Sequence, residues 1–248
     1  MRLVRILISL FLVTTPLLAW TPAADQRIAR KSAQLAPPDL KLLLDRYRAD
    51  YARGLQRAEA DEGSEQHQYF VLSRKGQLKT AILSSVDRSI TIVQKQEPMA
   101  SFAEELGVLS HLVADANTPF HTADDDPRLA GLHDDYEGYF ESRMLKFPTV
   151  FYGLEQNVLP SSLIERTMAR SARFYPLLSE EYFRSGESHT SSEFDDRSTA
   201  FGIAAVSYSH SVTDLVNLYY YIWKQVGGDV RTASLLEKGN LLLNEDSH

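Results

Sequence analysis

The stretch "HLVADANTPFHTADDDPRLAGLHDDYE", residues 111–137, holds three of the seven histidines of this 248-residue chain. His111 and Asp115 are four residues apart, and so are His133 and Glu137. In a helix, the two side chains of each pair project from the same face, one turn apart, and can bind one ion together. His121 follows a proline, where the chain turns back. Pairs that only stabilise a helix surface share this spacing, but five such residues within one short block favour a site for more than one metal ion.

Length and composition limit the classes of protein that remain open. A chain of 248 residues with 44% hydrophobic residues suits one globular domain. It contains no cysteine, which excludes disulfides, a thiol nucleophile, a cysteine-type zinc site and a lipoprotein attachment site. The formal net charge of −7 argues against a positively charged surface for binding nucleic acid. A metal site could still supply the positive charge that a phosphate needs.

The first residues, "MRLVRILISLFLVTTPLLAW", read as a secretory signal peptide over residues 1–19. Two arginines precede a short apolar run, and small residues end at Ala19. A membrane anchor is the alternative, although Thr14 to Pro16 interrupt the apolar core. Cleavage after Ala19 would leave Trp20 as the first residue and move the formal charge to −9. We therefore expect a secreted or periplasmic protein.

Helical periodicity dominates the rest of the chain, and sustained alternation is almost absent, so we expect an all-α fold. The expected helices cover residues 37–60, 76–96, 99–117, 160–183, 198–225 and 231–243. Pro119 should stop or kink the third of these at Thr118. His210 and its aromatic neighbours on the fifth should pack in the core. Polar turns are expected over residues 60–70, which contain His67, and over residues 121–133, which end at His133. Residues 184–198 are the best candidate for a mobile surface loop.

The order of "HLVAD", "PFH" and "HDDYE" resembles the zinc-dependent phospholipase C and single-strand nuclease superfamily. Its members are exported all-helical phosphodiesterases with a cluster of three zinc ions. In this family an Asp and a His lie upstream in a turn, and Asp61 and His67 in "ADEGSEQHQYF" fit them. The family's mature chain begins with a zinc-binding Trp, and Trp20 stands at the predicted cleavage point. The resemblance implies a single compact multi-helix domain over residues 20–248 with a buried zinc cluster.

The resemblance also implies how the ligands are shared among the zinc ions. One metal ion would be held by Asp61, His67, His111 and Asp115, and a second by His121, His133 and Glu137. A third would use Trp20 and Asp115, the latter as a bridge, with a histidine shortly after the tryptophan. Gln26 stands where we expect that histidine, and a glutamine amide is a much poorer zinc ligand. Asp25 beside it is an alternative donor. We expect two zinc sites with complete ligand sets and a third that lacks its histidine.

The expected activity follows from the metal ions. Two ions a few ångströms apart lower the pKa of a bridging water to about 7 and stabilise both oxygens of an in-line displacement at phosphorus. We expect a zinc-dependent phosphodiesterase, a phospholipase C-like hydrolase that attacks phosphorus with a metal-bound hydroxide. By resemblance, Asp61 is either a ligand or the base that acts on the water.

The substrate remains open at this stage. A phospholipid or another phosphodiester, with transient contact at a membrane surface, is favoured because the chain is compact and has neither cysteine nor a basic groove. Single-stranded nucleic acid is the alternative substrate, and an inactive periplasmic zinc-binding protein is a third hypothesis. Tyr136, Tyr139 and Phe140 could face a substrate or simply pack. The sequence implies no stable protein partner.

Overall fold

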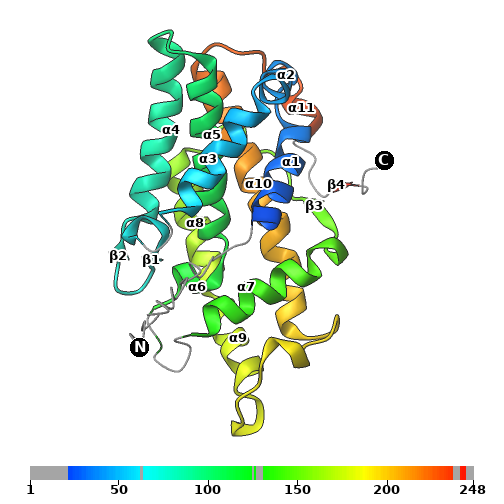
Figure 1. Cartoon of the computed structure of the whole chain (residues 1–248). Helices are drawn as coiled ribbons and strands as arrows, with labels where there is room; N and C mark the ends of the chain where they lie inside the picture. Colours follow the sequence, from blue (N-terminus) through cyan, green and yellow to red (C-terminus); the bar gives the residue numbers. More distant parts are fainter. Residues whose placement is uncertain (1–21, 62–63, 125, 127–130, 237–240, 244–248) are drawn as a thin grey trace, which may run out of the picture.

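The computed structural model describes residues 22–61, 64–124, 126, 131–236 and 241–243, and most of these are helical (Figure 1). The expected all-α class is confirmed. The signal peptide and Trp20 lie outside the described residues. The assignment of residues 20–248 to one domain stays a prediction.

The elements follow one another along the chain in this order: α1 (Pro22–Leu35), α2 (Pro38–Arg46), α3 (Arg48–Glu59), η1 (Glu65–His67), β1 (Tyr69–Phe70), β2 (Lys75–Gly76), α4 (Leu78–Gln94), α5 (Met99–Ala116), α6 (Pro119–Thr122), α7 (Leu132–Arg143), η3 (Met144–Lys146), β3 (Thr149–Phe151), α8 (Pro160–Ala172), α9 (Tyr175–Tyr182), η4 (Arg184–Gly186), η5 (Ser191–Glu193), α10 (Thr199–Gln225), α11 (Ala233–Leu236) and β4 (Leu241–Leu243).

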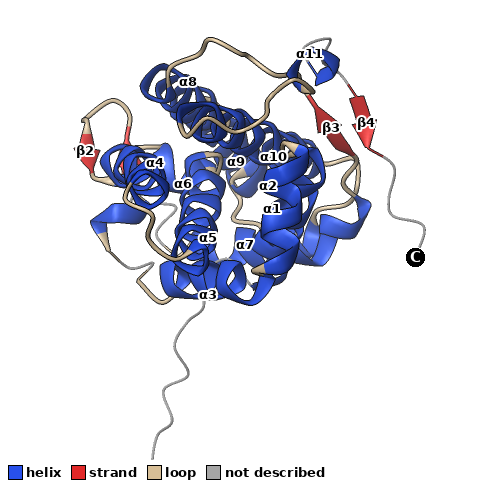
Figure 2. Cartoon of the chain, turned by 90° about the horizontal axis from the view of Figure 1, so that it is seen from above, coloured by secondary structure: helices blue, strands red, loops and turns tan. Residues whose placement is uncertain are grey.

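Helix α10 runs through the interior and organises the core. It has 27 residues, and buried positions occur all around it, as expected for a helix that neighbours enclose. Tyr208 and Tyr219 are fully buried in it, so the aromatic run packs as predicted. His210 is partly buried and stacks on Tyr152, with ring centroids 4.2 Å apart. Helices α1, α5, α8 and α9 all contact α10, and Figure 2 shows this bundle from above.

Two glycines allow α3 and α5 to touch at their backbones. A Cβ on Gly107 would lie 2.1 Å from the carbonyl oxygen of Tyr51, and a Cβ on Gly54 would lie 1.9 Å from that of Glu104. Both distances are far inside van der Waals contact, so only glycine fits at either position. The crossing fixes α5 one turn before His111.

The last expected helix, residues 231–243, is wrong. Among its described residues, only Ala233–Leu236 are helical, and Leu241–Leu243 forms a strand that pairs antiparallel with Thr149–Phe151. The prediction of a helix failed because the strand pairs with residues about 90 positions earlier in the chain, and local periodicity does not reveal such a partner. Side chains of α10 hold the same region: Ser209, Thr213 and Asn217 accept hydrogen bonds from the backbone amides of residues 150, 152 and 155.

Two other expected helices need correction. The helix expected over 37–60 breaks at Tyr47 into α2 and α3, with no proline or glycine at the break. The helix expected over 160–183 ends at Ala172 and restarts at Tyr175, because Pro176 fits only the first turn of a helix. The segment 184–198 lies mostly on the surface, as expected, with Phe194 buried and two short 3₁₀ turns, and its mobility stays a prediction. Helix α1 was not expected.

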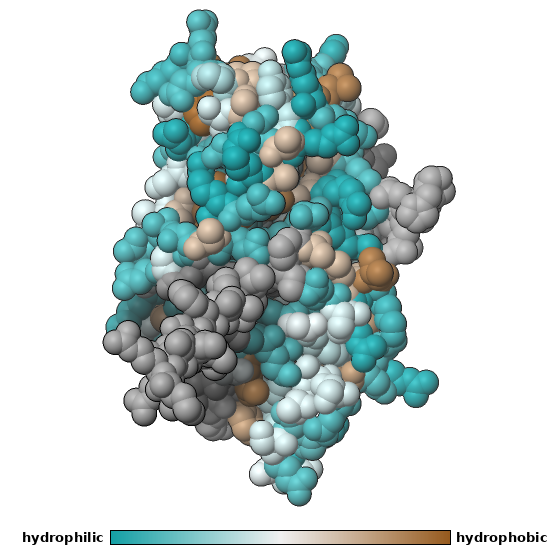
Figure 3. Space-filling view, in the orientation of Figure 1, coloured by the Kyte–Doolittle hydropathy of each residue, from teal (hydrophilic) through white to brown (hydrophobic). Residues whose placement is uncertain are grey.

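The face of the molecule drawn in Figure 3 is mostly hydrophilic, with hydrophobic residues scattered over it. Among the residues whose burial the structure describes, the large exposed hydrophobic side chains are Leu42, Leu72, Leu145, Tyr152, Leu159 and Leu177. In the part of the chain that the structure describes, we find no helix with the length and apolar character needed to cross a bilayer.

Candidate metal centre

Four elements bring the predicted histidines and acids together in the interior. Helix α5 carries His111 and Asp115 one turn apart, and α7 carries His133 and Glu137 in the same way. Helix α5 ends before Pro119, as predicted, and the short helix α6, which begins at Pro119, turns His121 back toward them. The 3₁₀ turn η1 ends at His67. These six side chains form two groups, each of which could hold a metal ion.

The first group consists of His67, His111 and Asp115, all buried. The Nδ1 atom of His67 lies 2.8 Å from Oδ2 of Asp115, and Nε2 of His111 lies 3.5 Å from the same oxygen. The two imidazole rings meet edge to face, with centroids 5.1 Å apart. Two nitrogens and a carboxylate oxygen therefore converge on one small volume.

The second group consists of His121, His133 and Glu137. The Oε1 atom of Glu137 lies 2.7 Å from Nε2 of His133 and 3.7 Å from Nε2 of His121. The two imidazole Nε2 atoms are 3.1 Å apart. His133 is about a quarter exposed, at 28% of its side chain, whereas His121 and Glu137 are buried. The second group is thus the more accessible of the two.

The two groups adjoin each other through Asp115 and His67. The Oδ1 atom of Asp115 lies 3.9 Å from Nε2 of His121, so one carboxylate faces imidazoles of both groups. His121 donates from Nδ1 to the carbonyl oxygen of His67 at 2.7 Å, which leaves Nε2 to face Glu137. A backbone acceptor on the second imidazole nitrogen is the usual way in which a protein orients a metal-binding histidine.

The charges of the groups are strongly coupled. Burial acts to raise the pKa of Asp115, but the imidazoles of His111, His121 and His67 outweigh it and lower the pKa to about 2. Burial likewise opposes ionisation of Glu137, and His121 and His133 keep its pKa below the usual value. Burial would lower the pKa of His121, but Asp115 and Glu137 raise it. Both carboxylates are therefore ionised at neutral pH, as metal ligands must be.

The donor set suits zinc. Zinc binds imidazole nitrogen and carboxylate oxygen, usually with four ligands, and each group offers three such donors. The Oδ1 atom of Asp115 is buried and accepts no hydrogen bond from any described residue. Leaving a carboxylate oxygen in that state costs free energy that a cation would offset. The residues present thus fit the metal that the sequence implies, with six of the eight predicted ligands brought together.

Asp61 is not brought into either group. Its side chain is exposed, and its carboxylate accepts a hydrogen bond from Ser64 Oγ at 3.2 Å. It shares with His67 the wall of a pocket of about 510 Å³ between α3, α4 and α5. Its assignment as a ligand or base stays a prediction, and Trp20, the other predicted ligand, lies outside the described residues.

The unexpected helix α1 supplies a carboxylate next to the first group. Asp25 is only 4% exposed, and its Oδ2 accepts a hydrogen bond from Nδ1 of His111. Gln26 is exposed and lines a groove on the other side of the helix. Asp25 is therefore the residue of α1 that contacts a histidine of the first group, whereas we expected Gln26 to occupy the place of the family's histidine. A sequence signal existed, because Asp25, Ile28 and Ser32 follow helical spacing after a proline.

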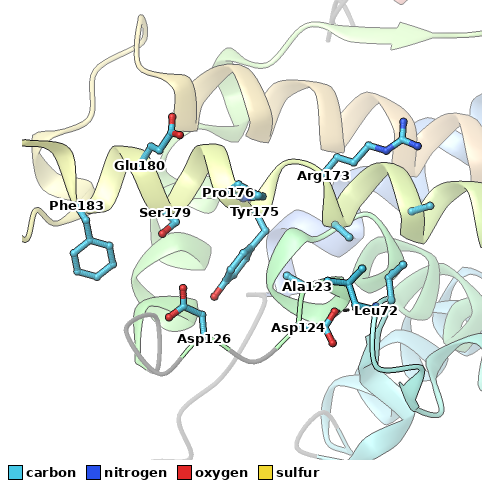
Figure 4. Close-up of a pocket in the computed structure, with 13 residues that line it drawn as sticks. Leu72, Ala123, Asp124, Asp126, Arg173, Tyr175, Pro176, Ser179, Glu180 and Phe183 are labelled. Carbon is cyan, nitrogen blue, oxygen red and sulfur yellow. Dashed lines mark hydrogen bonds between the residues drawn. The ribbon is translucent and has the colours of Figure 1, made fainter.

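A pocket of about 950 Å³ is lined by residues of α8 and α9, by Leu72 and by Ala123, Asp124 and Asp126, which follow α6 (Figure 4). Its lining is mainly apolar, and Ala123 in its wall is two residues beyond His121. The ring of Phe120 lies between the second group and this pocket, because its centroid is 5.7 Å from the ring of His133 and 5.7 Å from that of Tyr175, which lines the pocket. Asp124 shapes another wall by accepting hydrogen bonds from the amides of residues 72 and 73.

The comparison with solved structures finds proteins of similar fold. No protein-family model matches the chain, and no curated protein matches it. Among solved structures, it is similar to the alpha-toxin of Clostridium perfringens avian strain SWCP, with a TM-score of 0.65 and 13% identity over 84% of this chain and 65% of that chain. The alpha toxin of Clostridium absonum gives a TM-score of 0.63 and 12% identity over 85% and 65%.

The chain thus spans a little under two thirds of each alpha-toxin chain. At these identities the likeness shows the fold alone. The matched fold is that of the corresponding part of the two alpha-toxins, and within it this chain brings together two groups of histidine and carboxylate side chains.

Proposed function

We propose that this protein is a zinc-dependent phosphodiester hydrolase of the phospholipase C kind. The observation that carries the proposal is the pair of adjoining groups, His67 with His111 and Asp115, and His121 with His133 and Glu137. When bound there, zinc ions would activate water as a nucleophile and neutralise charge on the phosphoryl oxygens. The closeness of Asp115 to His121, at 3.9 Å, favours metal ions that act on one substrate.

The protein's own residues prepare this chemistry. Asp25 accepts a hydrogen bond from Nδ1 of His111, and the His67 carbonyl accepts one from Nδ1 of His121. Each of these bonds fixes the tautomer in which Nε2 carries the lone pair that a metal needs. Asp115 stays ionised because three imidazoles face it. The site is held in a binding geometry before any substrate arrives.

The pocket beside the second group supports a phospholipid as the substrate. Its apolar wall suits the hydrocarbon part of a lipid, and the charged residues among its described lining are three acids, Asp124, Asp126 and Glu180, with one arginine, Arg173. An acidic lining repels the phosphates of a nucleic acid strand and attracts a cationic head group. Tyr136, Tyr139 and Phe140 are buried and pack in the core, so they offer no faces on which bases could stack.

Two further proposals accompany this function. The arginines and apolar run of residues 1–19 support export to the periplasm or the medium, where a phospholipid substrate would be met. Leu72, 86% exposed in the turn that also borders the pocket, supports brief contact with a lipid surface.

The function is tested by offering three substrates to one preparation. Zinc-loaded and chelated protein are given phosphatidylcholine vesicles, single-stranded DNA and a chromogenic phosphodiester. We expect zinc-dependent release of the phosphorylated head group from the vesicles. Release of nucleotides without lipid cleavage would replace this function with a nuclease, and inactivity on all three with both zinc ions bound would mean that the protein only binds zinc.

The same assay separates the two roles of Asp61. If Asp61 is the base, Asp61→Asn should keep the zinc content and lose hydrolysis. If it is a ligand, the variant should lose zinc as well. Unchanged hydrolysis and unchanged zinc would remove Asp61 from the site.

A further inference from the structure

A short connection carries the chain from the first group to the second. Helix α5 supplies Asp115 and ends one residue later, and α6 supplies His121. Asn117 caps α5, and its backbone amide donates to the carbonyl oxygen of Ala114 at 3.0 Å. The end of α5 therefore sets where Asp115 stands relative to His121, whose Nε2 lies 3.9 Å from Oδ1 of Asp115.

The Asn117 side chain turns away from the metal groups. Residues two positions apart on a helix point to nearly opposite sides, so Asn117 and Asp115 face different neighbours. Asn117 is 2% exposed. Its Nδ2 donates to Oδ2 of Asp214 on α10 at 3.2 Å, and its Oδ1 accepts from Nη2 of Arg170 on α8 at 2.8 Å. One amide thus attaches the end of α5 to two other helices.

Asp214 anchors this attachment. It is 3% exposed, and its Oδ2 also accepts hydrogen bonds from Arg170 Nη2 at 2.6 Å and from Thr167 Oγ1 at 2.8 Å. A buried carboxylate is tolerated only with such partners, and the guanidinium of Arg170 balances its charge.

The amide of Asn117 fits against this ion pair in one orientation. Only its oxygen can accept from Arg170, and only its nitrogen can donate to Asp214. The ion pair could form without Asn117, so the two extra hydrogen bonds serve to fix α5. Hydrogen bonds to charged groups are the stronger kind, which suits them to hold a helix end in place.

We propose that Asn117, held by Asp214 and Arg170, is a positioning residue for the metal centre. It fixes the end of α5 and hence the place of Asp115 between the two groups. None of these three residues is a member of either group, so their substitution removes no metal ligand. The role rests on the proposed function only in requiring two adjoining metal ions.

The proposal is tested with Co²⁺ in place of zinc in the full-length protein, because the visible absorption bands of Co²⁺ follow the geometry of its ligands. We expect the native protein to bind two Co²⁺ ions. Asn117→Ala keeps the ion pair of Arg170 with Asp214 but detaches α5 from it. It should weaken the less tightly bound Co²⁺ by about 10-fold, the lower end of the range for groups that support metal ligands, and should shift the visible bands.

Thr167→Val is the matched control. It also removes one hydrogen bond to Asp214, with almost no change of shape, but it leaves both hydrogen bonds of Asn117 to the ion pair in place. Its melting temperature should fall about as much as that of Asn117→Ala, whereas Co²⁺ affinity and the visible bands should stay native. This comparison separates positioning of the metal centre from stability of the fold.

A double variant, Asn117→Asp with Asp214→Asn, exchanges the carboxylate and the amide. Arg170 still meets a carboxylate, and the amide nitrogen at position 214 can still donate to it. The double variant should therefore recover the native visible bands, and Asp214→Asn alone should not.

Three outcomes would overturn the role of Asn117: native Co²⁺ affinity and bands in Asn117→Ala, equal changes of the bands in Asn117→Ala and Thr167→Val, or a double variant whose bands match those of Asp214→Asn. Native protein that binds no Co²⁺ would overturn the metal centre together with this role. Protein that binds two Co²⁺ ions but cleaves no phosphodiester would lose the proposed hydrolysis alone, because these measurements use no substrate.

Discussion

His133 is the most accessible residue of the two groups, and it tests the second group by itself. His133→Ala removes an imidazole 2.7 Å from Glu137, so we expect elemental analysis to find one zinc ion fewer per chain. Hydrolysis should fall by two orders of magnitude or more, roughly the contribution of one electrostatic catalytic group.

His189 provides the matched control for that variant. It also lies four residues before a glutamate, and its Nδ1 is 2.8 Å from Glu193, but this pair is on the surface and far along the chain from the groups. His189→Ala should keep full zinc content and activity. Wild-type zinc content in His133→Ala would show that residues 133–137 do not bind zinc.

Metal binding should depend on pH through His121. Asp115 and Glu137 raise its pKa above 6.5 despite burial, so in the metal-free protein this imidazole is protonated up to a higher pH than usual. A metal ion must displace that proton, and zinc affinity should therefore already fall as the pH drops toward and below 6.5. Calorimetry in buffers of different ionisation enthalpy should detect proton release at pH 6.5. Zinc binding without proton release at that pH would contradict the assignment of His121.

At the residue scale, sequence spacing was enough to find ligands that share a helix. His111 with Asp115 and His133 with Glu137 follow from a four-residue period alone. Asp25 was considered only as a substitute for a histidine. Its contact with His111 comes from the packing of α1 against α5, which brings together residues more than 50 positions apart. Local patterns do not contain that information.

At the scale of elements, the crossing of α3 over α5 positions the first group. Gly107→Ala would place a methyl group 2.1 Å from the Tyr51 carbonyl oxygen, and relief of that clash must separate the two helices. We expect a loss of about 1–3 kcal/mol in the free energy of unfolding, as for other overpacked interfaces. Zinc affinity should fall too, because His111 is one turn further along α5. Denaturant unfolding measures the first effect.

Gly138→Ala is the control for helix propensity. Gly138 lies inside α7, and beyond its chain neighbours and the backbone of its own helix nothing lies within 4 Å of the position that an added Cβ would take, so alanine should stabilise the protein by roughly 0.5–1 kcal/mol. If both substitutions changed stability in the same direction, the close crossing of α3 and α5 would be in error.

The elements themselves were largely predictable where they are long and periodic. Residues 76–96, 99–117 and 198–225 agree with α4, α5 and α10, and Pro119 separates α5 from α6 as expected. Predictions failed where distant contacts decide the conformation, as in the strand Leu241–Leu243, or where a helix divides without a sequence marker, as at Tyr47. The short helix α11 (Ala233–Leu236) lies in the same stretch of chain as that strand, where a longer helix was expected.

At the scale of the whole molecule, bound metal should contribute much of the stability. The chain has no cysteine and hence no disulfide, and the two groups link α5, α6, α7 and η1. A ligand at a thousand times its Kd stabilises a protein by about 4 kcal/mol. For a chain of this size that corresponds to a melting temperature roughly 8–16 °C higher than after chelation. Scanning calorimetry with and without chelator measures it, and equal melting temperatures would show that metal does not stabilise the fold.

The two buried groups are expected to hold zinc ions, and anomalous X-ray diffraction tests this most directly. Crystals of zinc-loaded protein would be measured on both sides of the zinc absorption edge. We predict one anomalous peak among His67, His111 and Asp115, and another among His121, His133 and Glu137. Zinc-containing crystals with no anomalous density at these two places would contradict the assignment of both groups as zinc sites.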